Sequence, residues 1–175
     1  MKKELQKNDF LPALKTIMAF QWLNETELAK ILNISTIIHF EKGETIIYEG
    51  DIGSHLYGVI KGEVAVSVND KNGKDVVINN IGDGEIFGET AIFLASKRTA
   101  TIACPSETTV MQIKCQDLLR FFKAHPHTGN KLLMLIVLSL LNKLKHTNDD
   151  IVLEKYRSLN IIQAAEQIQK FIQES

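Results

Sequence analysis

Hydrophobic positions in the first 33 residues follow helical spacing. Phe10 and Leu14 are four positions apart, so they would share one face of a helix. Asn24 is followed three residues later by Glu27, which is the arrangement of a capping box at a helix N-terminus. The pattern therefore predicts that residues 1–33 are helical and that one helix begins after Asn24.

The hydrophobic period changes to two at residue 35. Between residues 35 and 113, Val, Ile and Thr are frequent and glycines recur at short intervals, as in strands joined by turns. Val64, Val66 and Val68 alternate with smaller or polar residues, which is the period of a half-buried strand. Short strands with regular turns predict a β sandwich or jelly roll.

A helical pattern returns near residue 117. Residues 117–124 have the spacing of a short helix that ends before Pro126, and a long helix is expected from Thr128. The apolar residues of the long helix repeat with a heptad period at Leu133, Val137, Leu140 and Leu144. This stripe can pack on the β domain, contact a second copy or a partner protein, or do both.

The heptad pattern weakens after residue 146, where polar residues occupy seam positions. A last amphipathic helix is expected over residues 160–173, and it is too short to be stable alone in water. We therefore expect two units. Residues 1–145 form a domain with N-terminal helices and the long helix, and residues 146–175 form a helical extension that packs on the domain or on a partner.

Composition narrows the range of functions. The chain has 175 residues, of which 45% are hydrophobic, and its net charge of −1 argues against non-specific nucleic-acid binding. The longest apolar run, residues 132–141, contains a serine and is too short to cross a bilayer. No signal peptide opens the chain, and Cys104 and Cys115 lack metal or redox spacing. We therefore expect a cytoplasmic protein with reduced cysteines in strands and no nucleic-acid or membrane partner.

The candidate chemistry is concentrated in residues 87–101. Gly88 lets backbone approach a ligand closely, and residues 90–94 suit a short helical turn whose free N–H groups attract an anion. Glu89 can accept hydrogen bonds from a sugar hydroxyl, and Arg98 can bind a phosphate with its planar fork. A phosphate and a sugar in one small pocket indicate a nucleotide. The alternative is that Glu89 and Arg98 form an internal ion pair that closes a loop.

This stretch resembles the phosphate-binding cassette of cyclic nucleotide-binding domains. The family pattern is present as Phe87-Gly88-Glu89 and, after a short turn, as Arg98-Thr99-Ala100. Upstream turns and strands match the same family at Lys42-Gly43-Glu44, Glu49-Gly50-Asp51 and Gly62-Glu63-Val64. The resemblance covers about residues 10–144. It implies a mainly β fold, an eight-stranded jelly roll with flanking N-terminal helices and a long C-terminal helix that covers the nucleotide.

The resemblance also implies a role for each residue of the cassette. The cyclic phosphate would be bound by Arg98, by the hydroxyl of Thr99 and by N–H groups of the short turn, including those of Gly88 and Ala91. Glu89 would accept the ribose 2′-hydroxyl. In relatives, a threonine directly after the arginine reaches the guanine of cGMP, but the same hydroxyl can serve the phosphate. Both cAMP and cGMP therefore remain possible ligands.

The base would lie against an apolar floor. Register with the family places Val66, Ile78 and Ile81 at positions that line the base. The alternative for these three residues is that they are ordinary core of the barrel.

The implied function is that of a sensor or regulatory module. Such a module binds cAMP or cGMP as a ligand, needs no further cofactor, has no catalytic residues and signals by movement of its C-terminal helices. A homodimer or a partner protein would contact the same helices. The alternative is a degenerate domain that keeps the fold as an interaction module and binds no nucleotide.

Two other classes are less consistent with the sequence. A DNA-binding regulator of this family carries a helix-turn-helix segment after the long helix, and no such segment is expected here. A metal enzyme with a cupin fold needs paired histidines inside the barrel, whereas His125 and His127 follow the strands. We therefore expect neither a metal site nor an enzyme.

Overall fold

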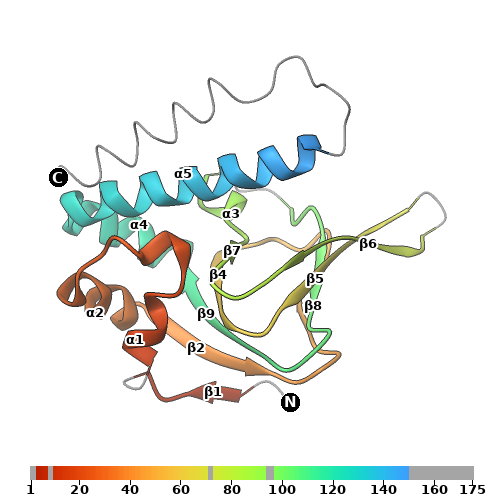
Figure 1. Cartoon of the computed structure of the whole chain (residues 1–175), viewed down its shortest axis with the longest axis horizontal. Helices are drawn as coiled ribbons and strands as arrows, with labels where there is room; N and C mark the ends of the chain where they lie inside the picture. The colour runs from red at the N-terminus through yellow and green to blue at the C-terminus, as the bar shows by residue number, and fades with distance from the viewer. Residues whose placement is uncertain (1–2, 8–9, 71–72, 94–96, 150–175) are drawn as a thin grey trace.

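The computed structural model describes residues 3–7, 10–70, 73–93 and 97–149. Two antiparallel sheets form a sandwich, with helices on one side (Figure 1). The five-stranded sheet has the order β1 (Lys3–Leu5), β2 (Ser35–Phe40), β9 (Thr108–Lys114), β4 (His55–Lys61) and β7 (Ile86–Phe87). The four-stranded sheet has the order β3 (Thr45–Ile47), β8 (Thr101–Ala103), β5 (Val64–Asn69) and β6 (Asp75–Ile81). This mainly β architecture with flanking helices confirms the predicted fold class.

The described helices lie before, within and after the strands. Three short helices precede β2, so the expected helical region is divided by non-helical segments. These helices are α1 (Leu11–Leu14), the 3-10 helix η2 (Met18–Phe20) and α2 (Glu25–Asn33). The single turn α3 (Thr90–Phe93) lies between β7 and β8. After β9, the last strand, the chain forms α4 (Cys115–Ala124) and α5 (Pro126–Asp149).

The predicted capping box is confirmed at the start of α2. The side chain of Asn24 accepts the Glu27 N–H at 2.9 Å, and the Glu27 carboxylate accepts the Asn24 N–H at 2.9 Å. Two N–H groups that have no acceptor within the helix are satisfied in this way.

The prediction of an entirely helical N-terminal region was wrong at β1. Lys3 pairs with His39 and Leu5 pairs with Ile37, so this short segment extends the five-stranded sheet. The free backbone groups at the edge of β2 attract it, and this contact over more than 30 residues leaves no local signature. Without β1, strands β2 to β9 are the eight strands that the resemblance implied.

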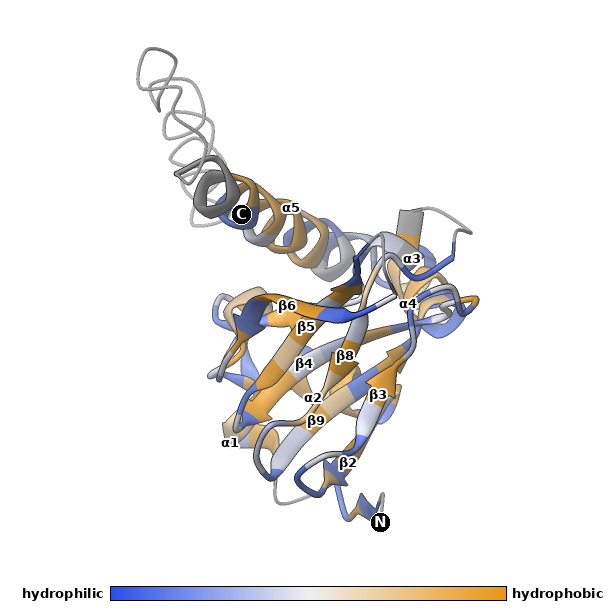
Figure 2. Ribbon diagram, turned by 90° about the vertical axis from the view of Figure 1, so that its right-hand side faces the viewer, coloured by the Kyte–Doolittle hydropathy of each residue, from blue (hydrophilic) through white to orange (hydrophobic). Residues whose placement is uncertain are grey.

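Two hydrophobic cores enclose the five-stranded sheet. Neighbouring residues of β2 point to opposite faces, with Ile37 in a core against the helices and Ile38 in a core between the sheets. Figure 2 shows hydrophobic residues along strands of both sheets and along α5. The five-stranded sheet is therefore buried on both faces, which makes it a rigid base for loops at its edge.

The strict alternation expected along β5 was wrong beyond Val64. A register shift lies between Val66 and Ser67, where Val66 pairs with Asn79 and Ser67 pairs with Val77. Val64 and Ser67 are buried, whereas Val66 is only partly buried. The extra residue of this bulge is Ile78 of β6, and Val66 packs at the margin of the core between the sheets. Such an insertion gives no signal in the hydrophobic pattern.

The buried face of α5 differs from its heptad seam. Leu133, Val137 and Leu140 are partly buried and Leu144 is 57% exposed. The face that packs on the domain instead contains Leu132, Leu135, Ile136 and Leu138. The helix also continues to Asp149, so the expected boundary at residue 145 falls inside it, and the helix expected over 160–173 lies outside the described residues.

Both cysteines are free and buried, and their expected place in strands was wrong. Cys104 directly follows β8, and Cys115 begins α4. Burial raises the pKa of both thiols above the ordinary value.

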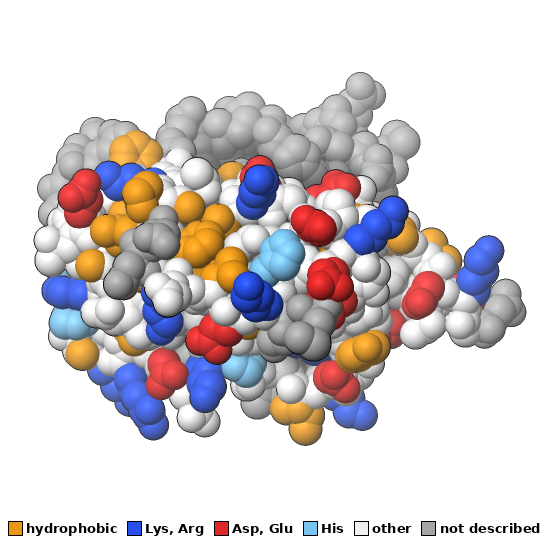
Figure 3. All heavy atoms as spheres, turned by 90° about the horizontal axis from the view of Figure 1, so that it is seen from below, with side chains coloured by type: hydrophobic (Ala, Val, Ile, Leu, Met, Phe, Trp, Pro, Cys, Tyr) orange, Lys and Arg blue, Asp and Glu red, His pale blue; other side chains and the backbone are white. Residues whose placement is uncertain are grey.

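Acidic and basic side chains are interspersed on the described part of the face shown in Figure 3. That face therefore presents no field of a single sign. Among the described helices, none combines the length and the apolar character needed to cross a membrane.

Candidate functional site

A cavity of about 710 Å³ is bordered by β5 and β6, by the loop around α3 and by α5. Part of its lining is apolar and comes from Val66, Ile78, Ile81, Ile102 and Leu140. Within the described part of the chain, its charged lining consists of Glu85, Glu89, Arg98 and Lys143. Such a cavity suits a ligand that has both an apolar surface and a charged group.

The loop between β7 and α3 requires a glycine at position 88. Gly88 has a φ of +76°, where residues with a side chain are strained. A Cβ atom there would also lie 2.9 Å from the carbonyl oxygen of His55. The turn α3 begins two residues later, so the N–H groups of Thr90 and Ala91 have no acceptor within the helix. Gly88 and Thr90 line the cavity, and Ala91 adjoins them in the chain.

Arg98 is a buried cation held by backbone oxygens. Its side chain donates one hydrogen bond to the carbonyl of Gly88 at 3.2 Å and another to the carbonyl of His55 at 2.8 Å. Arg98 is 8% exposed, and among the described residues no carboxylate lies within ion-pairing distance of its guanidinium. A buried charge without an opposite partner is unfavourable, so this position favours the binding of an anion.

The stem of Arg98 lies directly against the backbone of Gly53. A Cβ atom at Gly53 would be 2.0 Å from Nε of Arg98 and 2.3 Å from its Cζ. The backbone of Arg98 is also fixed, because its N–H donates to the carbonyl of Asp51 at 2.7 Å and its carbonyl accepts from Gly50 at 2.8 Å. The guanidinium is therefore directed by contacts on two sides.

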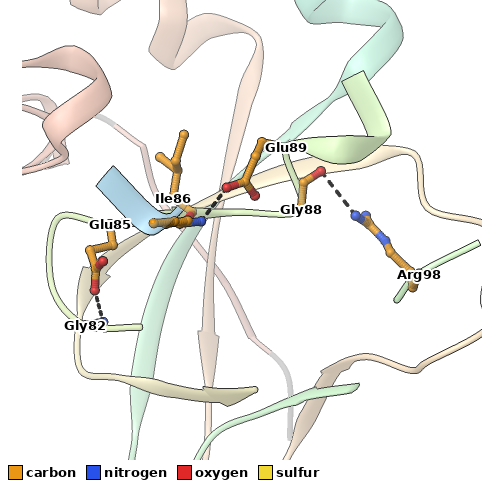
Figure 4. Close-up of polar contacts among 7 residues, drawn as sticks. Gly82, Glu85, Ile86, Gly88, Glu89 and Arg98 are labelled. Atoms are coloured by element: carbon orange, nitrogen blue, oxygen red, sulfur yellow. Dashed lines mark hydrogen bonds and ion pairs between the residues drawn. The ribbon is translucent and has the colours of Figure 1, made fainter. Parts of the chain in front are cut away.

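Glu89 forms an ion pair with Lys143 of α5, so the alternative of an internal Glu89–Arg98 pair was wrong. Glu89 and Arg98 instead lie on opposite sides of Gly88 (Figure 4). Glu89 is 6% exposed, and the ammonium of Lys143 also donates to the carbonyl of Ile86 at 2.6 Å. The carboxylate and the guanidinium are thus two separate charged groups within one cavity.

Two stacked rings support this loop from the sandwich side. The centroids of the Tyr57 and Phe87 rings are 4.8 Å apart and their planes are nearly parallel. Gln112 donates a hydrogen bond to the Tyr57 hydroxyl at 3.0 Å, and burial raises the pKa of that hydroxyl. Phe87 of the predicted motif is therefore a packing residue that fixes the start of the loop.

The structure brings the three expected base-pocket residues to the same cavity. Val66, Ile78 and Ile81 all line it. Ile81 is 5% exposed, as an ordinary core residue would be, but Ile78 is 60% exposed. Ordinary core packing therefore does not explain Ile78. Thr99 also lines the cavity and is exposed.

Sequence analysis missed two groups of residues at the site. Leu140 and Lys143 reach the cavity from α5, where the heptad pattern had placed Leu140 in a seam. Their spacing of three residues puts them on one face of the helix, which was the available signal. The second group is Gly53 and His55, whose backbones hold Arg98. A glycine three residues after Gly50 was visible as a turn signal only.

The paired histidines lie away from this cavity. His125 caps the C-terminus of α4, and His127 is the second residue of α5. Among the described residues, no group of three His, Cys, Asp or Glu side chains is arranged to hold a metal ion.

The part of the chain that contains this cavity matches one known family. A family model described as the cyclic nucleotide-binding domain matches residues 37–125, which is just over half of the chain. The chain belongs to the cyclic nucleotide-binding domain family. The matched residues of this cyclic nucleotide-binding domain include the whole loop from β7 to β8 and therefore Glu89 and Arg98.

Relatives of this domain occur in kinases and in transcription regulators. The chain is 35% identical over 99 residues to a cGMP-dependent protein kinase of Eimeria tenella. It is 31% identical over 105 residues to the cAMP-activated global transcriptional regulator CRP of Haemophilus influenzae. These matches cover 57% and 59% of this chain but only 9% of the kinase and 45% of the regulator. The shared part is the domain, not the whole of either relative.

The fold also agrees with a solved structure. A cyclic nucleotide-binding domain from Methylobacillus flagellatus has a TM-score of 0.78, with 90% of this chain and 92% of that chain covered. The sequence identity is 19%, so this likeness concerns the fold alone.

Proposed function

We propose that this domain binds a cyclic nucleotide monophosphate, cAMP or cGMP, and acts as a sensor or regulatory module rather than as an enzyme. The observation that carries the proposal is that Arg98 is buried beside the cavity and has no carboxylate partner among the described residues. Its buried guanidinium borders a cavity with apolar walls and has carbonyl oxygens, not a carboxylate, as described partners. A cyclic phosphate, which carries one negative charge, supplies the missing anion.

Under this proposal the phosphate contacts Arg98, the Thr99 hydroxyl and the N–H groups of Gly88 and Ala91. The support is that Arg98 and Gly88 are joined by a hydrogen bond of 3.2 Å and that Thr99 is exposed to the cavity. Glu89 accepts the ribose 2′-hydroxyl on the other side of Gly88 (Figure 4).

The base lies against Val66, Ile78 and Ile81. The support is their shared position in the cavity and the exposure of Ile78, which a base would cover. Removal of this apolar surface from water contributes to affinity without selecting between adenine and guanine.

The output of the module is a change in the position of α5. Leu140 of this helix already borders the cavity, so a bound base contacts the helix directly. A ligand shifts the helix only as far as its affinities for the two helix positions differ.

The test is calorimetric titration with cAMP and with cGMP after removal of any co-purified nucleotide. We expect one site per chain in the wild-type protein. In Arg98→Ala, truncation of one member of a buried charge pair costs about 2–5 kcal/mol, so binding should weaken by roughly 30-fold or more. The matched control is Arg120→Ala, because that side chain is 77% exposed on α4 and should leave the affinity unchanged.

Two results would contradict the proposal. The first is a folded Arg98→Ala protein that binds as tightly as wild type. The second is the absence of binding of either nucleotide, which would favour a degenerate domain that serves as an interaction module.

Contact with a second copy or a partner protein through the C-terminal helices is part of the same proposal. Its support is that Leu133 and Val137 are only partly buried and that Leu144 is 57% exposed on α5. Sedimentation at several concentrations, with and without nucleotide, tests for the dimer. A monomer throughout would leave a partner protein as the occupant of this seam.

A further inference from the structure

Lys143 links α5 to the carboxylate that the proposed function assigns to the ribose. Its ammonium donates to the carbonyl of Ile86 at 2.6 Å and forms an ion pair with Oε1 of Glu89. The two side chains come from segments 54 residues apart in the chain. Leu140, three residues earlier on the same face of α5, borders the same cavity.

The charge of the cavity depends on this lysine. Among the residues that the structure describes, its charged lining comprises two carboxylates, Glu85 and Glu89, and two cations, Arg98 and Lys143. Without Lys143 the negative side chains would outnumber the positive ones, in a site that must accept an anion. Glu85 is turned toward the Gly82 N–H, which it accepts at 2.8 Å, so Glu89 is the carboxylate that needs compensation (Figure 4).

The geometry leaves Glu89 able to bind a ligand while it is paired. An ionised carboxylate has two oxygens with about four lone-pair positions, and Lys143 contacts Oε1. No contact of Oε2 is found among the described residues, so this oxygen is available for a hydroxyl donor. The side chains of Lys143 and Glu89 are only 27% and 8% exposed, so water screens this pair far less than a surface pair.

We infer that Lys143 is a positioning residue for cyclic nucleotide binding: it neutralises and orients Glu89 for the ribose 2′-hydroxyl and holds α5 over the cavity. This inference rests on the proposed function. Under this inference, the ion pair between Lys143 of α5 and Glu89 couples the position of the ribose to the position of α5. Loss of the cation leaves a buried carboxylate without compensation beside the phosphate and releases one attachment of α5.

The test is a double-mutant cycle measured by calorimetric titration of the full chain. Lys143→Met keeps the length of the side chain and removes its charge, and we expect cAMP and cGMP to bind roughly 10-fold more weakly. Lys143→Arg keeps a cation and should restore most of the affinity. The matched control is Lys123→Met, an exposed lysine near the end of α4, which should change the affinity by less than about twofold.

The decisive comparison is Lys143→Met in a Glu89→Gln background. If Lys143 acts through Glu89, its removal should cost little once the carboxylate is neutral, so the two effects should be strongly non-additive. The 2′-deoxy analogue should also lose less affinity than the parent nucleotide on Lys143→Met. If Lys143 only attached α5 to the Ile86 carbonyl, Lys143→Met would lower the affinity by the same factor in both backgrounds.

The outcomes separate this inference from the proposed function. A wild-type protein that binds neither nucleotide overturns the proposed function and the inference with it. A wild-type protein that binds, with an unchanged affinity in folded Lys143→Met or an equal loss in both backgrounds, overturns the inference alone.

Discussion

Gly53 controls the position of the Arg98 guanidinium, and a single added methyl group tests this. In Gly53→Ala the new Cβ atom would lie 2.0 Å from Nε of Arg98, whereas ordinary contact begins at 3.4 Å. The arginine stem must therefore retreat by about 1.4 Å, which is the difference between these two distances. Hydrogen bonds of normal length do not survive such a shift, so the bonds to the carbonyls of Gly88 and His55 should be lost.

The expected effect is on affinity and also on stability. A charged hydrogen bond between the guanidinium and the phosphate contributes about 1.5–3 kcal/mol, and its loss corresponds to roughly 10- to 100-fold weaker cyclic nucleotide binding in Gly53→Ala. Gly53 does not have a positive φ, so alanine is allowed by the backbone. The lost hydrogen bonds to the two carbonyls belong to the free protein as well, so the midpoint of thermal unfolding should fall by roughly 4–8 °C, as for a loss of about 2 kcal/mol.

Calorimetric titration of Gly53→Ala beside Gly82→Ala measures this effect. Gly82 is the matched control, since a Cβ atom there meets only Glu85 Oε2, at 4.0 Å, and its φ is also not positive. We expect the control to bind as wild type does. Equal affinities in Gly53→Ala and wild type, with both proteins folded, would show that the guanidinium is not directed by Gly53.

Two further predictions concern specificity and stability. Thr99→Ala should weaken cGMP more than cAMP if the hydroxyl reaches the base. Equal losses in parallel titrations would assign that hydroxyl to the phosphate, and no loss with either nucleotide would show that it makes no contact. Glu27 is 7% exposed, and it accepts hydrogen bonds from the Asn24 N–H at 2.9 Å and from the Thr128 hydroxyl at 3.1 Å. It also forms an ion pair with Lys131 at 3.7 Å, so it connects α2 to α5. Glu27→Ala should destabilise the domain by about 2 kcal/mol and lower its unfolding midpoint by roughly 4–8 °C. An unchanged midpoint in a calorimetric scan would show that Glu27 does not stabilise the packing of α2 on α5.

The strands and the capping box were predictable because their signals are local. A two-residue alternation needs only neighbouring positions, and the Asn24–Glu27 pair is complete within four residues. The errors arose where the structure depends on pairing between strands, which leaves no local signal. The pairing of Lys3–Leu5 with β2 depends on residues more than 30 positions away, and the bulge beside Val66 depends on how β5 pairs with β6.

By itself, the sequence determined the fold class and placed Gly88, Glu89 and Arg98 in one candidate loop, because their spacing is short and their chemistry is distinctive. Tertiary structure decided what each of them contacts. The His55 carbonyl that holds Arg98 is 43 residues away in the chain, and Lys143, which pairs with Glu89, is 54 residues away. Such pairings arise only when the sandwich and α5 pack together, since no hydrophobic period or motif records which distant side chains will meet.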